Sequence, residues 1–239
     1  MISFVEEMVN LLYPRRCPIC QEILTDRTVL ICTSCRKKAV PIGEPKCKKC
    51  GKPLSGQMQE YCSDCRSREH FFTKGWAVFP YKKEIKQSVY QFKFHNKREY
   101  QEFYASEMVR IYGREILSWK PDAVIPIPMY RRKQRKRGYN QAELLAGLVS
   151  KKLGIPMDKE MLWRVRNTTP QKELTQKERE KNLRHAFKVR KKALQGGKFL
   201  LIDDIYTTGA TVDAAAKALL DAGAAEVRVL VLCIGQGEG

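Results

Sequence analysis

The sequence predicts an α/β domain, with a parallel sheet covered by helices, that follows a small cysteine-rich module. Two observations support this prediction: eight of the nine cysteines lie within residues 17–65, and the chain beyond them alternates short apolar runs with helical patterns. The apolar runs predict strands at 77–81, 123–127, 199–202 and 227–234. The periodic segments between them predict helices at 85–94, 102–117, 141–153 and 211–222.

Length and composition fit this organisation. A chain of 239 residues that is 43% hydrophobic and 30% charged has the balance of a folded protein. The length suits one α/β domain together with a small module. No apolar run approaches the ~18 residues that a membrane-spanning helix needs.

Residues 1–16 predict a short amphipathic helix, because apolar side chains such as Phe4 and Met8 recur at helical spacing. Glu6 and Glu7 stand where a secretory signal would be basic, so the segment is not expected to be a signal peptide. The helix either packs on the protein's own surface or contacts a membrane surface or a partner.

The positive charge is concentrated in one part of the chain. The formal net charge is +19, and residues 122–197 alone contribute +13. A field of this sign attracts phosphates, either on a nucleotide or along a nucleic-acid strand. The alternative is a solvated basic face that serves only solubility.

The clustered cysteines form four Cys-x-x-Cys pairs whose starts are spaced 15 residues apart. Such a pair puts two sulfurs on one side of a tight turn, where both can bind one tetrahedral zinc ion. Two pairs make a zinc ribbon, so the spacing predicts two ribbons over residues 17–72. The eight ligands are Cys17, Cys20, Cys32, Cys35, Cys47, Cys50, Cys62 and Cys65.

Alternatives to this zinc assignment concern the pairing and the redox state. Equal spacing leaves open whether neighbouring pairs share a zinc ion or whether the first pair joins the third. Disulfides are the other interpretation, and the lack of a signal peptide argues against them. Gly51 follows the third pair, where such a turn needs a positive φ. Cys233 stands apart in an apolar run and is expected to be a buried strand residue.

A chemically specific motif follows the predicted strand at 199–202. Two adjacent carboxylates, Asp203 and Asp204, precede a turn rich in threonine that opens a helix. Backbone N–H groups, hydroxyls and the helix N-terminus can bind one phosphate there. The carboxylates would repel a phosphate, so they are expected to accept hydrogen bonds from sugar hydroxyls or to help hold a metal ion. The motif therefore predicts a site for a 5-phosphoribosyl group.

Two further segments carry basic side chains. Residues 131–137 contain six basic residues in seven and follow the predicted strand at 123–127, which suits a pyrophosphate or a nucleic-acid backbone. Residues 164–182 are polar, basic and weakly periodic, and we expect a mobile loop there.

The threonine-rich turn resembles the binding fingerprint of type I phosphoribosyltransferases, which use 5-phosphoribosyl 1-pyrophosphate (PRPP). The turn comes after the strings Pro-x-Pro, Arg-Gly-Tyr-Asn-Gln and Arg-x-x-Asn, and all of these elements follow the paired cysteines. In this order they resemble the ComF (competence protein F) family from about residue 17 to 234. The resemblance implies a type I phosphoribosyltransferase-like domain over 73–239. Its hood would span about 77–99 and its core about 100–239.

The same resemblance implies roles for individual residues. The PRPP-binding residues would be Asp203, Asp204, Thr207, Thr208, Gly209, Ala210 and Thr211. Those of the pyrophosphate and flexible loops would be Arg131, Arg137, Arg166, Gln171 and Arg179. The candidates for binding DNA are Arg132, Lys133, Arg135 and Lys136. Two structural zinc ions and a Mg²⁺ ion that accompanies PRPP would be the cofactors. No catalytic residue is assigned, since Thr207 stands where several relatives that act on nucleobases carry an acid.

Three functions remain open at this stage. The first is a PRPP-binding protein that acts in DNA uptake during natural transformation and contacts single-stranded DNA through its basic face. The second is an active phosphoribosyltransferase with an unidentified small-molecule acceptor. The third is a DNA-binding adaptor whose transferase site is vestigial. For the first, the resemblance implies a cytoplasmic protein at the inner face of the membrane, with a competence DNA translocase or helicase as partner.

Overall fold

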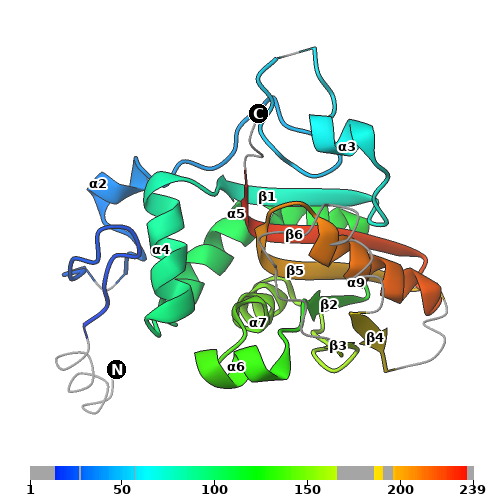
Figure 1. Cartoon of the computed structure of the whole chain (residues 1–239). Helices are drawn as coiled ribbons and strands as arrows, with labels where there is room; N and C mark the ends of the chain where they lie inside the picture. The colour runs from blue at the N-terminus through cyan, green and yellow to red at the C-terminus, as the bar shows by residue number, and fades with distance from the viewer. Residues whose placement is uncertain (1–13, 27, 57, 166–185, 191–195, 236–239) are drawn as a thin grey trace, which may run out of the picture.

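The computed structural model describes residues 14–26, 28–56, 58–165, 186–190 and 196–235. Two small cysteine modules precede an α/β domain in this part of the chain (Figure 1). The strands are β1 (Lys74–Pro80), β2 (Ala123–Pro126), β3 (Leu162–Arg164), β4 (Phe187–Val189), β5 (Lys198–Tyr206) and β6 (Glu226–Ile234). The helices are α2 (Thr33–Arg36), α3 (Ser63–Ser67), α4 (Lys83–Phe94), α5 (Tyr100–Trp119), α6 (Arg131–Arg137), α7 (Gln141–Leu153) and α9 (Ala210–Asp221).

The main sheet consists of four parallel strands in the order β1-β6-β5-β2. A single parallel bridge between Val124 and Met157 continues it beyond β2. The central strands β5 and β6 are rich in buried aliphatic side chains, because both faces of a parallel sheet are covered. Strands β3 and β4 form a separate antiparallel pair.

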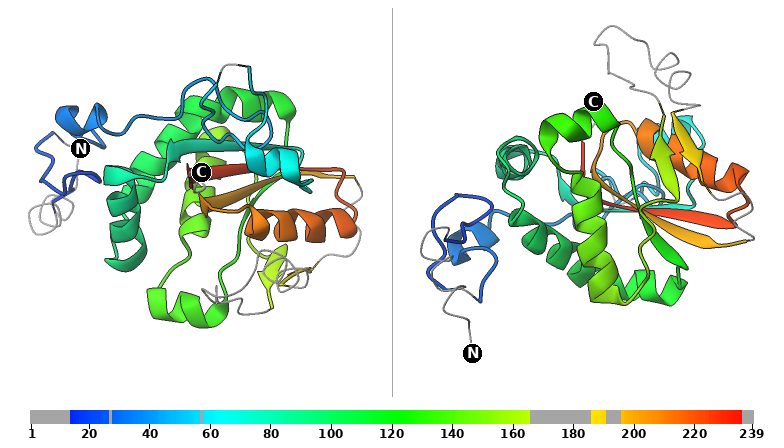
Figure 2. Two further views of the ribbon diagram at one scale, coloured as in Figure 1. Left: turned by 45° about the horizontal axis from the view of Figure 1, so that its top comes forward. Right: turned by 90° about the horizontal axis from the view of Figure 1, so that it is seen from below.

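Helices cover both faces of the main sheet, and Figure 2 shows α7 and α9 on opposite sides of the strands. Side chains alternate along a strand. Leu200 and Ile202 of β5 therefore share one core with α5 and α7, whereas Leu201 shares the other core with α9.

The connections define where a ligand fits. After β2 the chain continues through α7 to Met157, which lies beyond β2 at the edge of the sheet. After β5 it continues through α9 to β6, which lies on the other side of β5. In open parallel sheets, ligands bind outside the carboxyl ends of the strands at the point where the connections diverge in this way. The ends of β2 and β5 are therefore the expected binding crevice.

The two cysteine modules pack on different parts of the α/β domain (Figure 1). The first lies beside α4 and α5, where the Arg36 guanidinium reaches the buried Glu107 carboxylate at 2.5 Å. The second lies along β1, where the Gly75 N–H donates to the Lys49 carbonyl at 2.6 Å. Together with the chain that leads to it, the second module covers the otherwise open edge of β1.

All the strands and helices that the sequence predicts in the α/β domain are present, with small differences in their ends. Strand β5 continues to Tyr206, because Asp203 pairs with Val231 and Tyr206 pairs with Ile234. A loop was expected at 131–137, but the structure has helix α6, which Gly138 ends with a φ of 85°. Arginine, lysine and glutamine are good helix formers, which explains this difference. Residues 1–13 of the predicted N-terminal helix lie outside the described residues. None of the described helices is both long and apolar enough to cross a bilayer.

Candidate functional site: a phosphate-binding turn beside two cysteine clusters

The eight clustered cysteines form two groups of four. Within each group the sulfur atoms all lie within 4.8 Å of one another. Neighbouring pairs combine, so the alternative in which the first pair joins the third is wrong. The groups are Cys17, Cys20, Cys32 and Cys35, and Cys47, Cys50, Cys62 and Cys65.

The spacing of the sulfurs fits tetrahedral zinc. The Sγ atoms of Cys20 and Cys32 are 3.8 Å apart, and those of Cys50 and Cys62 are 3.7 Å apart. Four thiolates around zinc at about 2.3 Å lie about 3.8 Å from one another, whereas a disulfide requires about 2.05 Å. None of the nine cysteines forms a disulfide bond. The chain thus has two four-cysteine sites suited to structural zinc, and the disulfide alternative does not hold.

Both clusters use the same turn. The residue after the second cysteine is left-handed in each: Gln21 has a φ of 67° and Gly51 a φ of 79°. A Cβ atom on Gly51 would lie 3.0 Å from the Ala77 amide nitrogen of β1. The second module therefore needs glycine both for its turn and for its close approach to the sheet.

The second cluster is continuous with the core below the threonine-rich turn. Cys50, Phe72 and Tyr206 belong to one buried apolar cluster. The Phe72 ring meets the Tyr206 ring edge-on at 6.3 Å. Burial raises the pKa of Tyr206, which keeps its hydroxyl neutral. The second cysteine module thus supports the last residue of β5, immediately before the turn.

The turn between β5 and α9 presents polar groups to solvent. Thr207 and Thr208 are exposed, and Gly209 has a φ of 79°. A Cβ atom on Gly209 would overlap the ring and hydroxyl of Tyr206, so glycine is required by space as well as by conformation. No side chain caps the start of α9 among the described residues. The N–H groups of its first turn are therefore available to an anion.

The segment that joins the second module to β1 contacts the first turn of α9 and holds it in place. His70 Nδ1 and Asp213 Oδ2 lie 2.6 Å apart, and the Phe71 N–H donates to Asp213 Oδ1 at 3.1 Å. The His70 ring stacks on Phe72 with 4.9 Å between centroids. This clamp was not predicted from the sequence, because no local pattern links residues separated by more than 140 positions.

The two carboxylates lie on opposite faces of the end of β5. Asp204 is buried toward α4, where it pairs with the Lys93 ammonium at 2.9 Å. The Asp203 carboxylate accepts the Asp204 N–H at 2.8 Å. Burial and repulsion from Asp204 raise the pKa of Asp203 to about 7, against the attraction of Lys93 and Arg164. The strand end therefore offers one acceptor toward α4 and a second toward β3.

Basic side chains of α6 and β3 influence one another, and Arg164 lies near Asp203. Partial desolvation and repulsion from Arg164 and Arg137 lower the pKa of Lys133, whose side chain is still exposed. Burial also lowers the pKa of Arg164, while Asp203 opposes that effect. A bound anion would relieve this repulsion, so these side chains suit a phosphate or pyrophosphate.

The basic residues predicted from the sequence do not all have the same environment in the structure. Arg137 is partly buried and donates to Gln141 Oε1 at 2.8 Å. The remaining basic residues of α6 face solvent: Arg131, Arg132, Lys133, Arg135 and Lys136. The predicted flexible-loop residues Arg166, Gln171 and Arg179 lie outside the described residues. Arg164 was not singled out from the sequence, and only its place at the end of β3 brings it near Asp203.

The string Arg-Gly-Tyr-Asn-Gln also has a structural role. Asn140 caps α7 by accepting the Ala142 N–H at 3.2 Å, and its amide donates to the Ile127 carbonyl at 3.0 Å. The buried Tyr139 hydroxyl donates to the Phe92 carbonyl of α4. This string therefore joins the end of β2 and the start of α7 to α4.

Comparisons with known proteins agree with this architecture. A double zinc ribbon domain model matches residues 8–66, and a phosphoribosyl transferase domain model matches residues 108–239. Competence protein F of Haemophilus influenzae is 32% identical over 219 residues, which cover 90% of this chain and 94% of the relative. The chain belongs to the competence protein F family.

Other relatives in the competence protein F (ComF) family match over most of their length. DNA utilization protein YhgH of Escherichia coli K12 is 30% identical over 92% of this chain and 97% of its own. Competence protein ComFC of Bacillus subtilis is 31% identical over 82% of this chain and 80% of its own. The two matched models correspond to the two cysteine modules and to most of the α/β domain.

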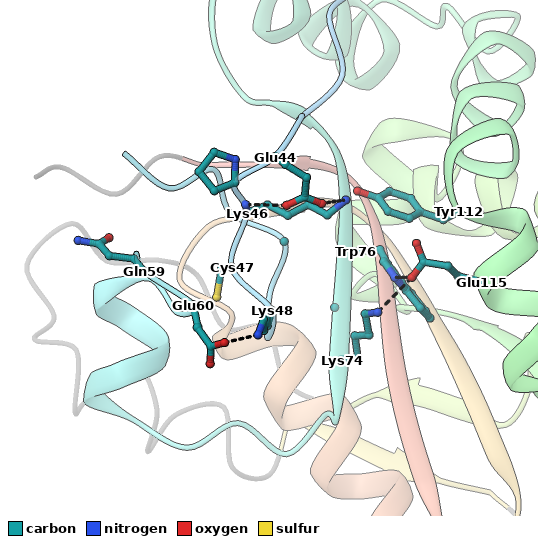
Figure 3. A pocket seen from close by; sticks show the side chains of 13 residues that line it. Glu44, Lys46, Cys47, Lys48, Gln59, Glu60, Lys74, Trp76, Tyr112 and Glu115 are labelled. Carbon is teal, nitrogen blue, oxygen red and sulfur yellow. Dashed lines mark hydrogen bonds and ion pairs between the residues drawn. The ribbon is translucent and has the colours of Figure 1, made fainter. Parts of the chain in front are cut away.

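This ComF protein also has a cavity of about 650 Å³ away from the turn, between the second module, β1 and α5 (Figure 3). Its charged groups pair with one another: Lys46 with Glu44 at 3.1 Å, and Lys74 with Glu115 at 3.0 Å. Lys48 likewise pairs with Glu60. Because these charges are compensated, the cavity has no preference for an anionic ligand, in contrast to the turn.

Proposed function

We propose that this ComF protein binds PRPP at the carboxyl ends of β5 and β2 and acts in DNA uptake. One arrangement carries the proposal: the uncapped start of α9 lies beside the two carboxylates at the end of β5. The 5-phosphate would bind the N–H groups and hydroxyls of residues 207–211, as anions do at helix N-termini. The ribose hydroxyls would donate to Asp203 and Asp204.

The pyrophosphate end of PRPP would face the cationic groups. Arg164 lies near Asp203, and together with Arg137 it is our candidate for pairing with the pyrophosphate. Arg131, Arg166, Gln171 and Arg179 remain our candidates for loops that complete this end. A Mg²⁺ ion held by the pyrophosphate and the carboxylates would supply further charge neutralisation.

Lys93 must change partners when PRPP binds. Its ammonium pairs with Asp204 at 2.9 Å. A ribose hydroxyl that donates to Asp204 would compete with this ion pair. The displaced ammonium would then be available to the phosphates, which makes Lys93 a hood residue suited to sensing the ligand.

The proposed role in DNA uptake is supported by the relatives, which are named competence and DNA utilization proteins. Helix α6 has six basic and no acidic side chains. Such a surface favours a phosphate backbone. We assign the contact with single-stranded DNA to Arg132, Lys133, Arg135 and Lys136. A competence DNA translocase or helicase at the cytoplasmic face of the membrane is the partner that fits this role.

Binding without turnover is the function that the geometry supports best. Thr207 stands where the resemblance to type I phosphoribosyltransferases would place an acid in enzymes that act on nucleobases, and no catalytic residue is assigned to this site. A purely vestigial site is disfavoured, because the adjacent Asp203 and Asp204, which share a largely buried strand end, would be costly to retain without a ligand.

Calorimetric titration with PRPP and Mg²⁺ tests the proposal. Asp203→Asn combined with Asp204→Asn should weaken binding by at least about tenfold, since each charged hydrogen bond contributes about 1.5–3 kcal/mol. Asp221→Asn combined with Glu60→Gln removes the same charge from exposed positions elsewhere and is the control. Equal PRPP affinity in the two double variants would refute the ribose assignment.

A further inference from the structure

Two large aromatic rings are exposed on the outer surface of α4. Tyr90 is 51% exposed and Phe94 is 57% exposed. Their centroids are 4.9 Å apart at 45°, and the His95 ring lies 5.5 Å from Tyr90. Exposed aromatic rings in contact with one another mark a binding surface more strongly than single scattered ones. We call this group of three rings the α4 platform.

The α4 platform is not needed to hold the helix on the protein. The buried face of α4 consists of Ile85, Ser88, Val89 and Phe92, at helical spacing. The apolar members of this stripe belong to one core with α5 and the first module. Tyr90 and Phe94 lie outside the stripe, so their aromatic surface is free to bind a partner.

Positive charge lies next to the platform. The Arg137 guanidinium of α6 lies 4.7 Å from the Phe94 ring centroid. This contact joins the platform to α6, whose charged side chains are all basic. Lys93, the residue before Phe94, reaches the Asp204 carboxylate of the PRPP site. The rings thus contact a cationic helix, and the residue before Phe94 reaches the end of β5.

Aromatic rings beside a basic track are what single-stranded nucleic acids require. The basic side chains follow the phosphates, and successive bases stack on the rings without regard to sequence. An acidic peptide would use the charges but not the rings, and an apolar partner would leave the charges of α6 uncompensated. Charge and ring together therefore favour single-stranded nucleic acid as the occupant.

We propose that the α4 platform stacks bases of single-stranded DNA whose phosphates lie on α6, at the mouth of the PRPP site. This inference rests on the proposed function, because it names the residues that contact the DNA bases. Tyr139 of the string Arg-Gly-Tyr-Asn-Gln is not part of the platform, because it is buried beneath Arg98 and cannot stack on a base.

Fluorescence anisotropy with labelled oligothymidylate and with an abasic strand of equal length tests the platform. Tyr90→Ala combined with Phe94→Ala should weaken oligothymidylate binding by about tenfold or more and leave the salt dependence unchanged, because phosphate contacts remain. Abasic binding should not change. Replacing the basic residues of α6 by alanine should instead flatten the salt dependence for both strands. Tyr61→Ala combined with Leu117→Ala, at exposed positions elsewhere, is the control.

A conservative variant adds a measurement that separates base stacking from loss of structure. Phe94→Trp should retain oligothymidylate affinity, and the new indole should be quenched by oligothymidylate but not by the abasic strand. Equal affinity of wild type and the double alanine variant for both strands would overturn the platform while the α6 contact stands. Absence of any DNA binding by wild type would instead overturn the DNA part of the proposed function. Conversion of a dimer to a monomer by the double alanine variant would assign this face to a second copy and also overturn the platform.

Discussion

Substitution of Gly209 by alanine tests the geometry of the phosphate-binding turn. Gly209 has a φ of 79°, and an added Cβ would overlap the buried Tyr206 ring. The left-handed conformation costs a residue with a side chain about 1–2 kcal/mol. Forcing an extra methyl group into a packed site costs about 1–3 kcal/mol more. The variant should therefore lose roughly 2–5 kcal/mol of unfolding free energy.

Gly154→Ala separates the two contributions. Gly154 ends α7 with a φ of 69°, and a Cβ atom there would meet nothing within 4 Å. It should show the conformational cost alone, about 1–2 kcal/mol. Thermal unfolding followed by circular dichroism measures both variants. For a chain of this size 1 kcal/mol shifts Tm by about 2–4 °C, so we expect a loss of roughly 4–20 °C for Gly209→Ala and roughly 2–8 °C for Gly154→Ala.

PRPP titration completes this test. Gly209→Ala should weaken PRPP binding, because relief of the overlap moves the N–H groups at the start of α9. Gly154→Ala should bind PRPP as wild type does, since the end of α7 contributes no group to the turn. Equal Tm losses together with equal PRPP affinities would refute the reasoning about the contact between Gly209 and Tyr206.

Three further predictions concern Asp203 and the metal sites. Burial and repulsion from Asp204 raise the pKa of Asp203 to about 7. The stability that this group contributes is present below its unfolded pKa of about 4 and is lost as the pH rises through about 7. The Tm of Asp203→Asn should therefore increase relative to wild type between about pH 5 and about pH 8, and a constant difference would contradict the assignment. Metal analysis should find two zinc ions per chain, both released by a chelator. Cys62→Ser should lower Tm and PRPP affinity more than Cys20→Ser, because Cys62 shares a buried core with Tyr206 whereas Cys20 is exposed. Equal effects of the two cysteine variants would argue against support of the turn by the second module.

Local sequence patterns predicted most of the fold for physical reasons. The apolar runs became the strands of a sheet buried on both faces, where continuous hydrophobicity is required. The Cys-x-x-Cys spacing predicted two four-cysteine sites, because a short turn dictates where two sulfurs point. The end of β5 was placed too early, since Asp203 and Asp204 are polar although they continue the pairing with β6.

The contacts that tune the candidate site could not be predicted from the sequence. Lys93 meets Asp204, and His70 meets Asp213, across more than 100 positions of the chain. No periodicity or spacing reports such pairs, because they depend on how α4 and the second module pack on the sheet. The exposure of Phe94 likewise depends on which face of α4 the core covers.

A crystal structure of the protein with PRPP and Mg²⁺ tests the central claim most directly. We predict the 5-phosphate against the backbone of residues 207–211, the ribose hydroxyls on Asp203 and Asp204, and Lys93 displaced from Asp204. A turn left empty at saturating PRPP, or PRPP seated in the cavity between the second module and α5, would contradict this claim.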